Sequence, residues 1–458
     1  MSKKLKIFVF IESDFVIRNF IRSHAFDNLI ETHDVHYVMP DPGFKRFVVE
    51  TPLDLFKAPI HRVSIPEYRS LFWKWLFLAD QMKPTLNRSV YERRKTYARM
   101  IGWKAELMLT AASLPVLNTL FRAYVRKRMA EYPCKELTDL LDAEKPDMLV
   151  HPSTFDGCYI NDVIAEGKKR SIPSVLIMNS WDNPSLKRSS SGIADWVLVW
   201  AEQTKRHTHQ FMKVPLDRVI KLGAAQFDLY QRPPAMTRDE FCAEHNIDPK
   251  NKIVLYAGSS RQANEIDELK QLDQRIENGE LSNVTILYRP HPWGGGGRGG
   301  KDIIKTEWKN VVIENSMLSY LQRLSDGDKT PDTADYNRTH VILSSIDALI
   351  SPFSTIILEG ALHGKPVMCL MTDETENIKI RKNLIHFEEI FALETVPTAY
   401  QENDLVEEIQ SLVDKSNDPK FRKALLKDME FFVEYSKKPY DIALTEFIEH
   451  IVSEPSAT

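Results

Sequence analysis

The sequence predicts an α/β protein with two Rossmann-like, doubly wound domains and a helical insert in the first domain. Its 458 residues are more than one ordinary hydrophobic core needs, so two domains are the starting expectation. Short apolar runs alternate with amphipathic segments, as buried parallel strands alternate with helices. The alternation falls into two series, which the Pro-containing stretch 231–235 separates. We therefore place the domain boundary near residue 232.

The first series predicts strands and helices in the order of a parallel sheet. Residues 5–11 form a mostly apolar run of strand length, and residues 16–29 have the apolar spacing of an amphipathic helix. Residues 1–232 are accordingly assigned to the N-terminal domain. Its further strands are expected at residues 35–39, 148–151, 174–178 and 196–200.

A mostly helical insert, about residues 65–141, interrupts this first series. It is dense in aromatic and basic residues, with Trp73 and Trp75 close to a cluster of cations. Two interpretations stay open. Either the aromatic side chains fill the core of the domain, or residues 65–130 make peripheral contact with anionic lipid. The cations are Arg88, Arg93, Arg94, Lys95, Arg99, Lys104, Arg122, Arg126, Lys127 and Arg128.

The second series predicts another doubly wound domain over residues 233–430. The tail, residues 404–452, has helical apolar spacing, and we expect residues 431–458 to form a C-terminal helix that packs back on the first domain. The strands of the second domain are expected at residues 252–257, 285–288, 311–313, 348–350 and 367–370.

Composition and charge limit the classes of partner. Lys and Arg number 60 against 64 Asp and Glu, and the net charge of −4 gives no overall attraction to nucleic acid. The 4 cysteines form no CxxC pair, which argues against a structural zinc site or a disulfide framework and favours a reducing cytoplasm. The sequence has no run of about 18 uncharged apolar residues. The chain is therefore expected to be cytoplasmic, or peripheral on the inner face of the membrane.

Two polar segments follow the first two predicted strands of the second domain. Gly258, Ser259 and Arg261 follow the first strand, where glycine lets a backbone approach closely and arginine supplies a fixed cation. Arg289 and His291 follow the second strand, and a proline on each side of His291 stiffens the backbone. The alternative is that the two prolines only terminate the strand and His291 binds no ligand. Because the carboxyl ends of parallel strands share one edge of a sheet, we expect these residues to form a ligand site.

A third polar segment follows the strand at residues 348–350. Ser354 and Thr355 stand where a helix begins, and their hydroxyls and the free backbone N–H groups would suit a phosphate. Glu359 lies about one helical turn further on, within reach of a ribose hydroxyl beside that phosphate. The alternative is that Ser354 only caps the helix and Glu359 is a solvated acid.

Together these segments resemble the nucleotide-binding half of GT-B fold glycosyltransferases of bacterial surface-polysaccharide synthesis, including uncharacterised transferases of capsule and lipopolysaccharide loci. The CDP-glycerol glycerophosphotransferases are similar in this region too. The resemblance covers about residues 1–30 and 145–370 and does not explain the insert. It depends on Arg-Pro-His-Pro at 289–292, Ser-Pro-Phe-Ser-Thr at 351–355, Glu-Gly-Ala at 359–361, Gly-Lys-Pro at 364–366 and Asn-Ser-Trp-Asp-Asn-Pro at 179–184.

The resemblance implies roles for the donor-site residues. The donor diphosphate would rest on Ser354 and Thr355, Glu359 would hold the ribose, and His291 would stabilise the departing phosphate. Such enzymes need neither a metal ion nor another cofactor, because the helix dipole and basic side chains neutralise the leaving group. The Asp-Gly-Asp triplet at 326–328 lies in a polar loop and is expected to face solvent.

An inverting transfer also needs a general base for the acceptor hydroxyl, which we expect from the N-terminal, acceptor-side domain. The candidates are Asp14, Asp156 and Asp182, with Asp14 first because it follows the first strand. Each of them would also suit a helix cap or a turn. A retaining enzyme would need no such base.

The sequence therefore predicts a metal-independent glycosyltransferase that moves a sugar from a nucleotide-activated donor to a surface glycan or a lipid-linked acceptor. Three alternatives accompany this prediction. One is a phosphotransferase of the CDP-glycerol or CDP-ribitol type, another is a non-hydrolysing UDP-sugar 2-epimerase, and the last is a nucleotide-binding module without activity.

Overall fold

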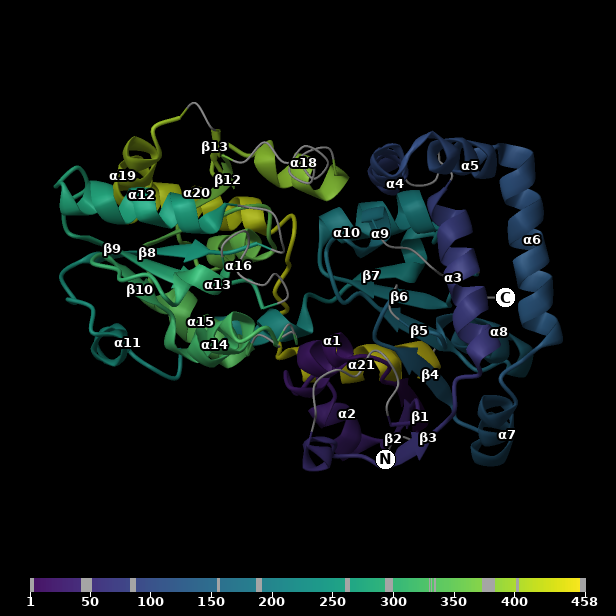
Figure 1. Ribbon diagram of the computed structural model, residues 1–458. Coiled ribbons are helices and arrows are strands. Elements are labelled where there is room, and N and C mark those ends of the chain that lie inside the picture. Colours follow the sequence, from purple (N-terminus) through teal and green to yellow (C-terminus); the bar gives the residue numbers. More distant parts are fainter. Residues whose placement is uncertain are drawn as a thin grey trace. The chain divides into compact units, whose positions relative to one another are not determined.

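The computed structural model describes residues 4–42, 52–82, 88–154, 157–186, 192–259, 264–292, 300–328, 330, 332, 335–372, 384–400 and 403–453. Two compact units make up the chain (Figure 1). The first runs to Asp228 and adds Leu384–His386 and the segment from Phe431, while the second comprises Leu229–Asn383 and Phe387–Glu430. Each unit has its own parallel sheet with helices. The predicted class, α/β with two Rossmann-like doubly wound domains, is thereby confirmed.

The described part of the first unit contains a seven-stranded parallel sheet in the order β3-β2-β1-β4-β5-β6-β7. The order reverses beside β1, where Ile7 pairs with Val35 of β2 on one side and with Met148 of β4 on the other. The sequence did not predict β3 and β7, which are short edge strands with too few apolar residues to form a run. The strands are β1 (Lys6–Phe10), β2 (Asp34–Met39), β3 (Ile60–Arg62), β4 (Met148–His151), β5 (Ser174–Ile177), β6 (Trp196–Val199) and β7 (Val219–Lys221).

Both faces of the first sheet are buried. Ile7 and Val9 of β1 belong to one apolar cluster, whereas Phe8 and Phe10 belong to another, as the alternation of side chains along a strand requires. The single helix expected over 16–29 is divided: a π-helical segment follows α1, and the chain then turns before α2 begins. The helical elements around this sheet are α1 (Asp14–Val16), η1 (Ile17–Ile21), α2 (Asp27–Thr32), η2 (Leu53–Leu55), α8 (Ile160–Arg170), α9 (Asn183–Leu186), α10 (Glu202–His207), η3 (Thr208–Met212), η4 (Leu216–Arg218) and η5 (Ala225–Gln231).

The insert between β3 and β4 is helical, as the sequence predicted. Helices α3 and α6 lie side by side (Figure 1) around a small core of Phe72, Leu76 and Val125, to which the half-buried Trp75 adds. The chain turns from α4 into α5 at Gly102, whose φ of 132° strains any other residue. The helices are α3 (Glu67–Gln81), α4 (Arg88–Ile101), α5 (Trp103–Ser113), α6 (Pro115–Glu131) and α7 (Lys135–Glu144).

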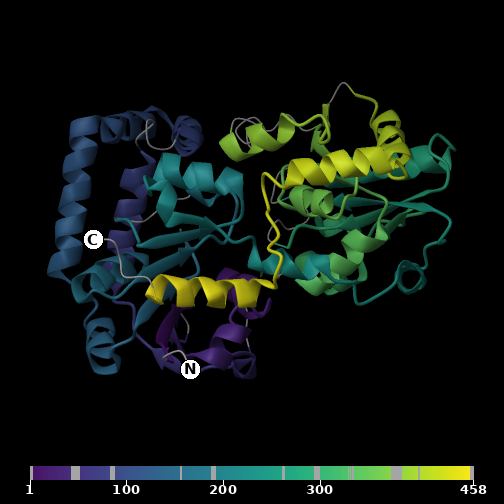
Figure 2. The ribbon, with the colours of Figure 1, turned by 180° about the vertical axis from the view of Figure 1, so that it is seen from behind.

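The last helix, α21 (Tyr440–Ser453), belongs to the first unit although it comes from the far end of the sequence. Tyr440, Leu444 and Ile448 recur at helical spacing and are buried in the same cluster as the apolar residues of β1 and α2. Figure 2 shows α21 in yellow beside the purple N-terminal helices.

Among the described residues, the second unit has a six-stranded parallel sheet in the order β10-β9-β8-β11-β12-β13. Its order reverses between β8 and β11, where Tyr256 pairs with Ile350. The strands are β8 (Lys252–Ala257), β9 (Val284–Arg289), β10 (Val311–Ile313), β11 (Ala348–Ser351), β12 (Val367–Met371) and β13 (Thr398–Tyr400). The helices are α11 (Arg238–His245), α12 (Glu265–Glu277), α13 (Gly300–Ile303), α14 (Leu318–Ser325), α15 (Tyr336–Ser345), α16 (Ile356–Leu362), α18 (Ile385–Phe391), α19 (Leu405–Lys415) and α20 (Pro419–Met429), with the 3-10 turn η6 (Asn315–Met317).

Candidate donor site

The candidate site lies at the carboxyl edge of the second sheet, where its strand order reverses. Gly258 and Ser259 follow β8, His291 follows β9, and Ser354 and Thr355 come shortly after β11. Open α/β sheets bind ligands at such a reversal, because the loops on either side diverge and leave room between them. The structure therefore gathers along one edge the three polar segments that the sequence singled out.

Gly258 brings the first two segments together. Its N–H donates to the carbonyl of Arg289 at 2.8 Å. A Cβ at this position would lie 3.0 Å from the backbone nitrogen of His291 and 2.5 Å from Oε2 of Glu265. Only glycine fits without displacing its neighbours, so the loop after β8 and the Pro-His-Pro segment after β9 are packed backbone to backbone.

The side chain of Arg289 is buried and contacts other protein groups. It donates to Thr339 Oγ1 at 3.0 Å, and its Nε lies 3.9 Å from a carboxylate oxygen of the fully buried Glu314. Burial alone would raise the pKa of Glu314, but hydrogen bonding to His245, the Arg289 charge and the bonds to Ser316 lower this pKa to about 2. Arg289 thus anchors the end of β9, and its contact with a donor stays a prediction.

The third segment does not match the alternative in which Ser354 only caps the helix and Glu359 is a solvated acid. The N-cap of α16 is Thr355 rather than Ser354, and Thr355 makes no side-chain capping hydrogen bond. Glu359 is buried and is not a solvated acid. Its Oε2 accepts a hydrogen bond of 2.6 Å from the phenol of Tyr230.

Two histidines that the sequence did not single out, His363 and His340, extend this network from Glu359. His363 Nδ1 lies 2.8 Å from the carbonyl oxygen of Glu359, and its Nε2 lies 2.8 Å from His340 Nδ1. The ring of Tyr230 covers His363, with 4.3 Å between ring centroids. Burial lowers the pKa of both histidines, that of His363 to about 3. His363 is therefore neutral near pH 7, and its hydrogen bond to the Glu359 carbonyl and its packing against Tyr230 stabilise this end of α16.

A buried acid beneath Gly258 was also missed. Glu265, the first residue of α12, is fully buried and accepts hydrogen bonds from the N–H of Ser259 at 2.9 Å and from the hydroxyl of Tyr288 at 2.6 Å. A glutamate six residues after a strand-end serine gives no recognisable sequence signal. Its burial depends on the fold.

The first unit has a polar cluster at the corresponding reversal of its own sheet. Glu12 follows β1, and its carboxylate lies 2.7 Å from Nε2 of His151, the last residue of β4. The backbone N–H groups of Cys158 and Tyr159 donate to the same carboxylate at 2.6 and 3.0 Å. A Cβ at Gly157 would lie 2.5 Å from His151 Nε2, so this loop also requires glycine. Both Glu12 and His151 are fully buried, which fits a structural role.

Two of the three candidates for the general base, Asp14 and Asp182, lie among the described residues. Both belong to the first unit and are buried. Asp14 is the first residue of α1, but the N-cap is Ser13, whose hydroxyl oxygen accepts the N–H of Val16. Asp182 directly precedes α9 and accepts a hydrogen bond of 2.5 Å from the hydroxyl of Ser180.

Some predicted features lie outside the described residues, namely Arg261, Asp156 and the side chain of Trp73. Asp326 and Asp328 are exposed, as expected. Within the described ranges, no three His, Cys, Asp or Glu residues are placed to hold a metal ion together. In that part of the chain, no helix has the length and apolarity that crossing a bilayer demands.

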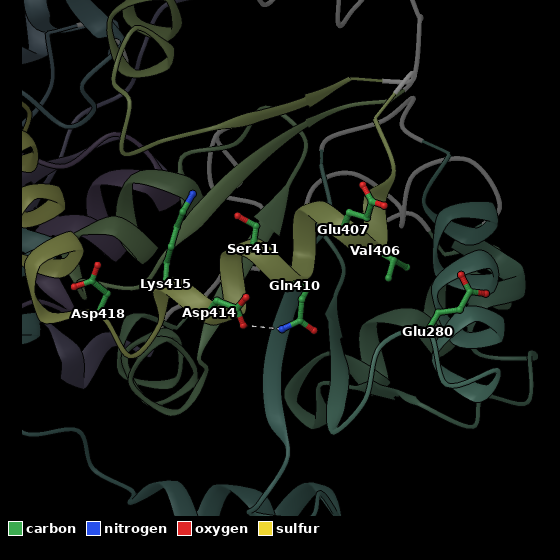
Figure 3. A pocket seen from close by; sticks show the side chains of 8 residues that line it. All are labelled: Glu280, Val406, Glu407, Gln410, Ser411, Asp414, Lys415 and Asp418. Carbon is green, nitrogen blue, oxygen red and sulfur yellow. Dashed lines mark hydrogen bonds between the residues drawn. The ribbon is translucent and has the colours of Figure 1, made fainter.

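A surface hollow of about 640 Å³ lies elsewhere on the second unit (Figure 3). Glu407, Gln410, Asp414 and Lys415 of α19 line one side, and Glu280 stands on a separate segment. The Gln410 amide donates to Asp414 at 2.7 Å. These side chains are polar, four of the eight that line the hollow are acidic, and the hollow lies away from the strand ends, so we do not assign the donor to it.

Comparison with protein families gives one match, which covers more than half of the chain. The family described as CDP-glycerol:poly(glycerophosphate) glycerophosphotransferase matches residues 181–438. This range includes Asp182 and all the predicted donor residues. No curated protein matches the chain in sequence.

Solved structures share the fold at low sequence identity. A structure assigned as a UDP-N-acetylglucosamine 2-epimerase of Listeria monocytogenes has a TM-score of 0.56 at 11% identity, covering 100% of this chain and 99% of its own. The UDP-GlcNAc 2-epimerase of Neisseria meningitidis, bound to UDP-GlcNAc, has a TM-score of 0.51 at 14% identity, covering 98% and 100%. The wall teichoic acid polymerase TagF gives 0.48 at 11% identity, covering 97% and 88%.

Proposed function

The chain belongs to the CDP-glycerol:poly(glycerophosphate) glycerophosphotransferase family, and from this membership we propose that it transfers a phosphate-linked polyol from a CDP-activated donor to a hydroxyl group of a cell-surface polymer. It is a transferase with a GT-B-like fold. The sequence alone predicts glycosyl transfer, with the transfer of a phosphate-linked polyol as the first alternative. The family match across residues 181–438 is the observation that favours the second.

The proposed reaction is a displacement at phosphorus. The acceptor oxygen attacks the phosphorus that carries the polyol, and a new P–O bond forms. The bond from this phosphorus to the bridging oxygen of the diphosphate breaks, and CMP leaves with the bonding electrons. The proton of the acceptor hydroxyl passes to a general base. Glycosyl transfer would instead break the bond at the anomeric carbon and release a nucleoside diphosphate or monophosphate, according to the donor.

We propose that the edge of the second sheet binds the donor. Ser354 and Thr355 would receive the diphosphate, Glu359 the ribose, and His291 the phosphate that departs as CMP. Gly258 and Ser259 border the same edge. Backbone N–H groups and a positioned histidine would stabilise charge that develops on the leaving group. The proposal includes no metal ion, and activity is expected to persist in EDTA.

The general base is proposed to come from the first unit, with Asp14 ahead of Asp182 and Asp156. A base acts in the transition state and does not bind the nucleotide. Asp14→Asn should therefore lower kcat with little change in donor affinity. An equal loss of donor affinity would assign Asp14 to structure and leave Asp156 and Asp182 as the next candidates.

We also propose that helices α5 and α6 bring the protein to anionic lipid and so to a lipid-linked acceptor. Large apolar side chains are exposed here, among them Trp103 at 71%, Leu107 at 61% and Leu120 at 62%. Exposed Lys104 and Lys127 are cations on the same two helices. Apolar insertion and charge attraction add, at about 1 kcal/mol for each cation near an anionic surface.

Product identity tests the reaction. Purified protein would be incubated with CDP-glycerol and a glycerol phosphate oligomer, and the released nucleotide would be identified by chromatography. We expect CMP, together with an oligomer longer by one glycerol phosphate. A nucleotide released only from sugar donors would establish glycosyl transfer instead, and interconversion of UDP-GlcNAc with its 2-epimer would establish an epimerase. Binding without turnover of any of these donors would leave a nucleotide-binding module.

A further inference from the structure

Glu265 occupies an unusual place for a glutamate, because its carboxylate is fully enclosed directly behind the loop after β8. Oε1 accepts the N–H of Ser259, and Oε2 accepts the hydroxyl of Tyr288. The absence of a side chain at Gly258 makes room for it, since a Cβ there would lie 2.5 Å from Oε2. One carboxylate thereby joins the loop after β8 to the end of β9, next to His291.

The groups around Glu265 determine when it is ionised. Burial is the largest influence on the pKa of Glu265 and raises it, and the nearby carboxylate of Glu268 raises it further. The hydrogen bonds from Tyr288 and Ser259 lower this pKa, and the resulting value is about 7. Glu268 itself accepts hydrogen bonds from the hydroxyls of Tyr256 and Thr372. Burial raises the pKa of both Tyr256 and Tyr288 well above 10, so that both phenols stay neutral.

Protonation changes what this carboxylate can do. The ionised form is only an acceptor, and both of its partners act as donors. The backbone N–H of Ser259 cannot accept a proton, so an added proton must reside on Oε2 and turn the Tyr288 hydroxyl into an acceptor. The bond from Ser259 to Oε1 then loses its charge assistance and becomes weaker.

From this geometry we infer that Glu265 is a positioning residue, which in its ionised form holds the Gly258–Ser259 loop in place beside His291 for donor binding. The inference rests on the proposed function, because the bound molecule is taken to be a nucleotide-activated donor. It adds a pH dependence that the proposed reaction alone does not require. Donor affinity should fall as the pH falls through about 7.

The test measures CDP-glycerol affinity by calorimetry between about pH 5.5 and pH 8.5. Glu265→Gln keeps the shape of the side chain and imitates the protonated form, since its amide oxygen accepts from Ser259 and its NH₂ donates to Tyr288. We expect this variant to bind CDP-glycerol roughly tenfold more weakly than the wild type above the transition, and with equal affinity below it. The exposed Glu277→Gln, at the far end of α12, is the matched control and should reproduce the wild-type profile.

A second variant tests the cause of the transition. Glu268→Gln removes the neighbouring negative charge, and the midpoint of the affinity profile should therefore move to lower pH. Identical profiles for wild type and Glu265→Gln would overturn the inference, as would an unchanged midpoint in Glu268→Gln.

Amide hydrogen exchange separates this inference from the proposed function, because it needs no ligand. The Gly258–Ser259 segment should be better protected at about pH 8.5 than at about pH 5.5, after correction for intrinsic exchange, in the wild type but not in Glu265→Gln. If CDP-glycerol does not bind at any pH while this protection pattern is present, the donor assignment fails and the positioning role is retained. If the protection is the same in both proteins, the positioning role fails.

Discussion

The phenol of Tyr230 contacts the side chain that we propose to bind the donor ribose. The Tyr230 hydroxyl donates to Oε2 of Glu359 at 2.6 Å, and the Tyr230 ring packs against His363. Tyr230 lies just after the last residue of the first unit, Asp228, in the segment that leads into the second. The orientation of the Glu359 carboxylate therefore depends on the conformation of this connecting segment.

Removing the phenol tests this dependence. Tyr230→Phe keeps the ring packing but deletes a hydrogen bond to a charged acceptor, which is worth about 1.5–3 kcal/mol. The KM for the donor should rise about tenfold or more, with a smaller change in kcat. Tyr400→Phe alters an exposed tyrosine of the same unit and is the control. A variant with wild-type KM and wild-type affinity for CMP would contradict the role of Tyr230.

The raised pKa of Glu265 also predicts how stability depends on pH. Because its pKa in the folded protein is about 7, against 4.5 for the free side chain, the folded state binds more protons than the unfolded state between these values. The contribution of Glu265 to stability is thus full below about pH 4.5 and is lost as the pH rises to about 7, by about 3 kcal/mol. Urea unfolding of Glu265→Gln across this range should lack this decline. A decline of equal size in the variant would show that another group causes it.

At the scale of elements, the insert combines a small buried core with a large exposed apolar surface. Phe72, Leu76 and Val125 pack α3 against α6, and Trp75 contributes to that core. Trp75 therefore packs on a small core of the insert itself, separate from the cluster that contains Ile7 and Val9 of β1. Most of the exposed large apolar residues of the insert lie at the end of α4, on α5, between α5 and α6, and on α6, and these are Met100, Ile101, Trp103, Leu107, Met108, Leu114, Val116, Leu117, Leu120, Phe121 and Tyr124.

Charge placed in this surface should abolish lipid binding. Leu107→Asp and Leu120→Asp each put a carboxylate where insertion into lipid is proposed, at a cost of several kcal/mol of burial and repulsion. Co-sedimentation with phosphatidylglycerol vesicles should be strong for the wild type at low salt and lost in the double variant. Leu216→Asp, at an exposed leucine outside the insert, should bind like the wild type. No co-sedimentation of the wild type at low salt would refute the lipid surface.

At the scale of the whole molecule, the first unit is assembled from segments far apart in the sequence. The core of the first unit includes Leu444 and Ile448 of α21 together with the apolar residues of β1 and α2. The unit is thus completed by the last helix of the chain, and its stability should depend on that helix.

Leu444→Ala tests this dependence. Leu444 is fully buried, and truncating such a leucine to alanine costs about 2–5 kcal/mol. Denaturant unfolding should show this loss in the transition of the first unit. Val452→Ala, at an exposed position of the same helix, should change stability by less than about 0.5 kcal/mol. If both substitutions had the same small effect, α21 would not be a part of that core.

The two α/β series and the edge on which the candidate donor residues gather could both be predicted from local sequence patterns. Buried parallel strands carry continuous apolar runs, as at 252–257, and the polar residues after them must share an edge because all the strands run in the same direction. The edge strands β3, β7 and β13 and the break after residue 21 escaped prediction, whereas the edge strand β10, whose three residues are all apolar, was predicted. Short strands with polar residues and a π-helical segment leave no apolar run or period to recognise.

Which polar side chains are buried, and which groups they bond to, follows from tertiary contacts that the sequence pattern does not reveal. The sequence suggested a ligand role for Glu359 but left a solvated acid as the alternative, and it gave no signal for Glu265. Burial and the hydrogen bonds from Tyr230 and Tyr288 make both of them oriented, desolvated carboxylates. Likewise, the exposure of the apolar side chains of Trp103 and Leu107 is a property of the folded insert. The physical reason is that burial and pKa depend on contacts between residues distant in the chain, and local periodicity carries no information about those contacts.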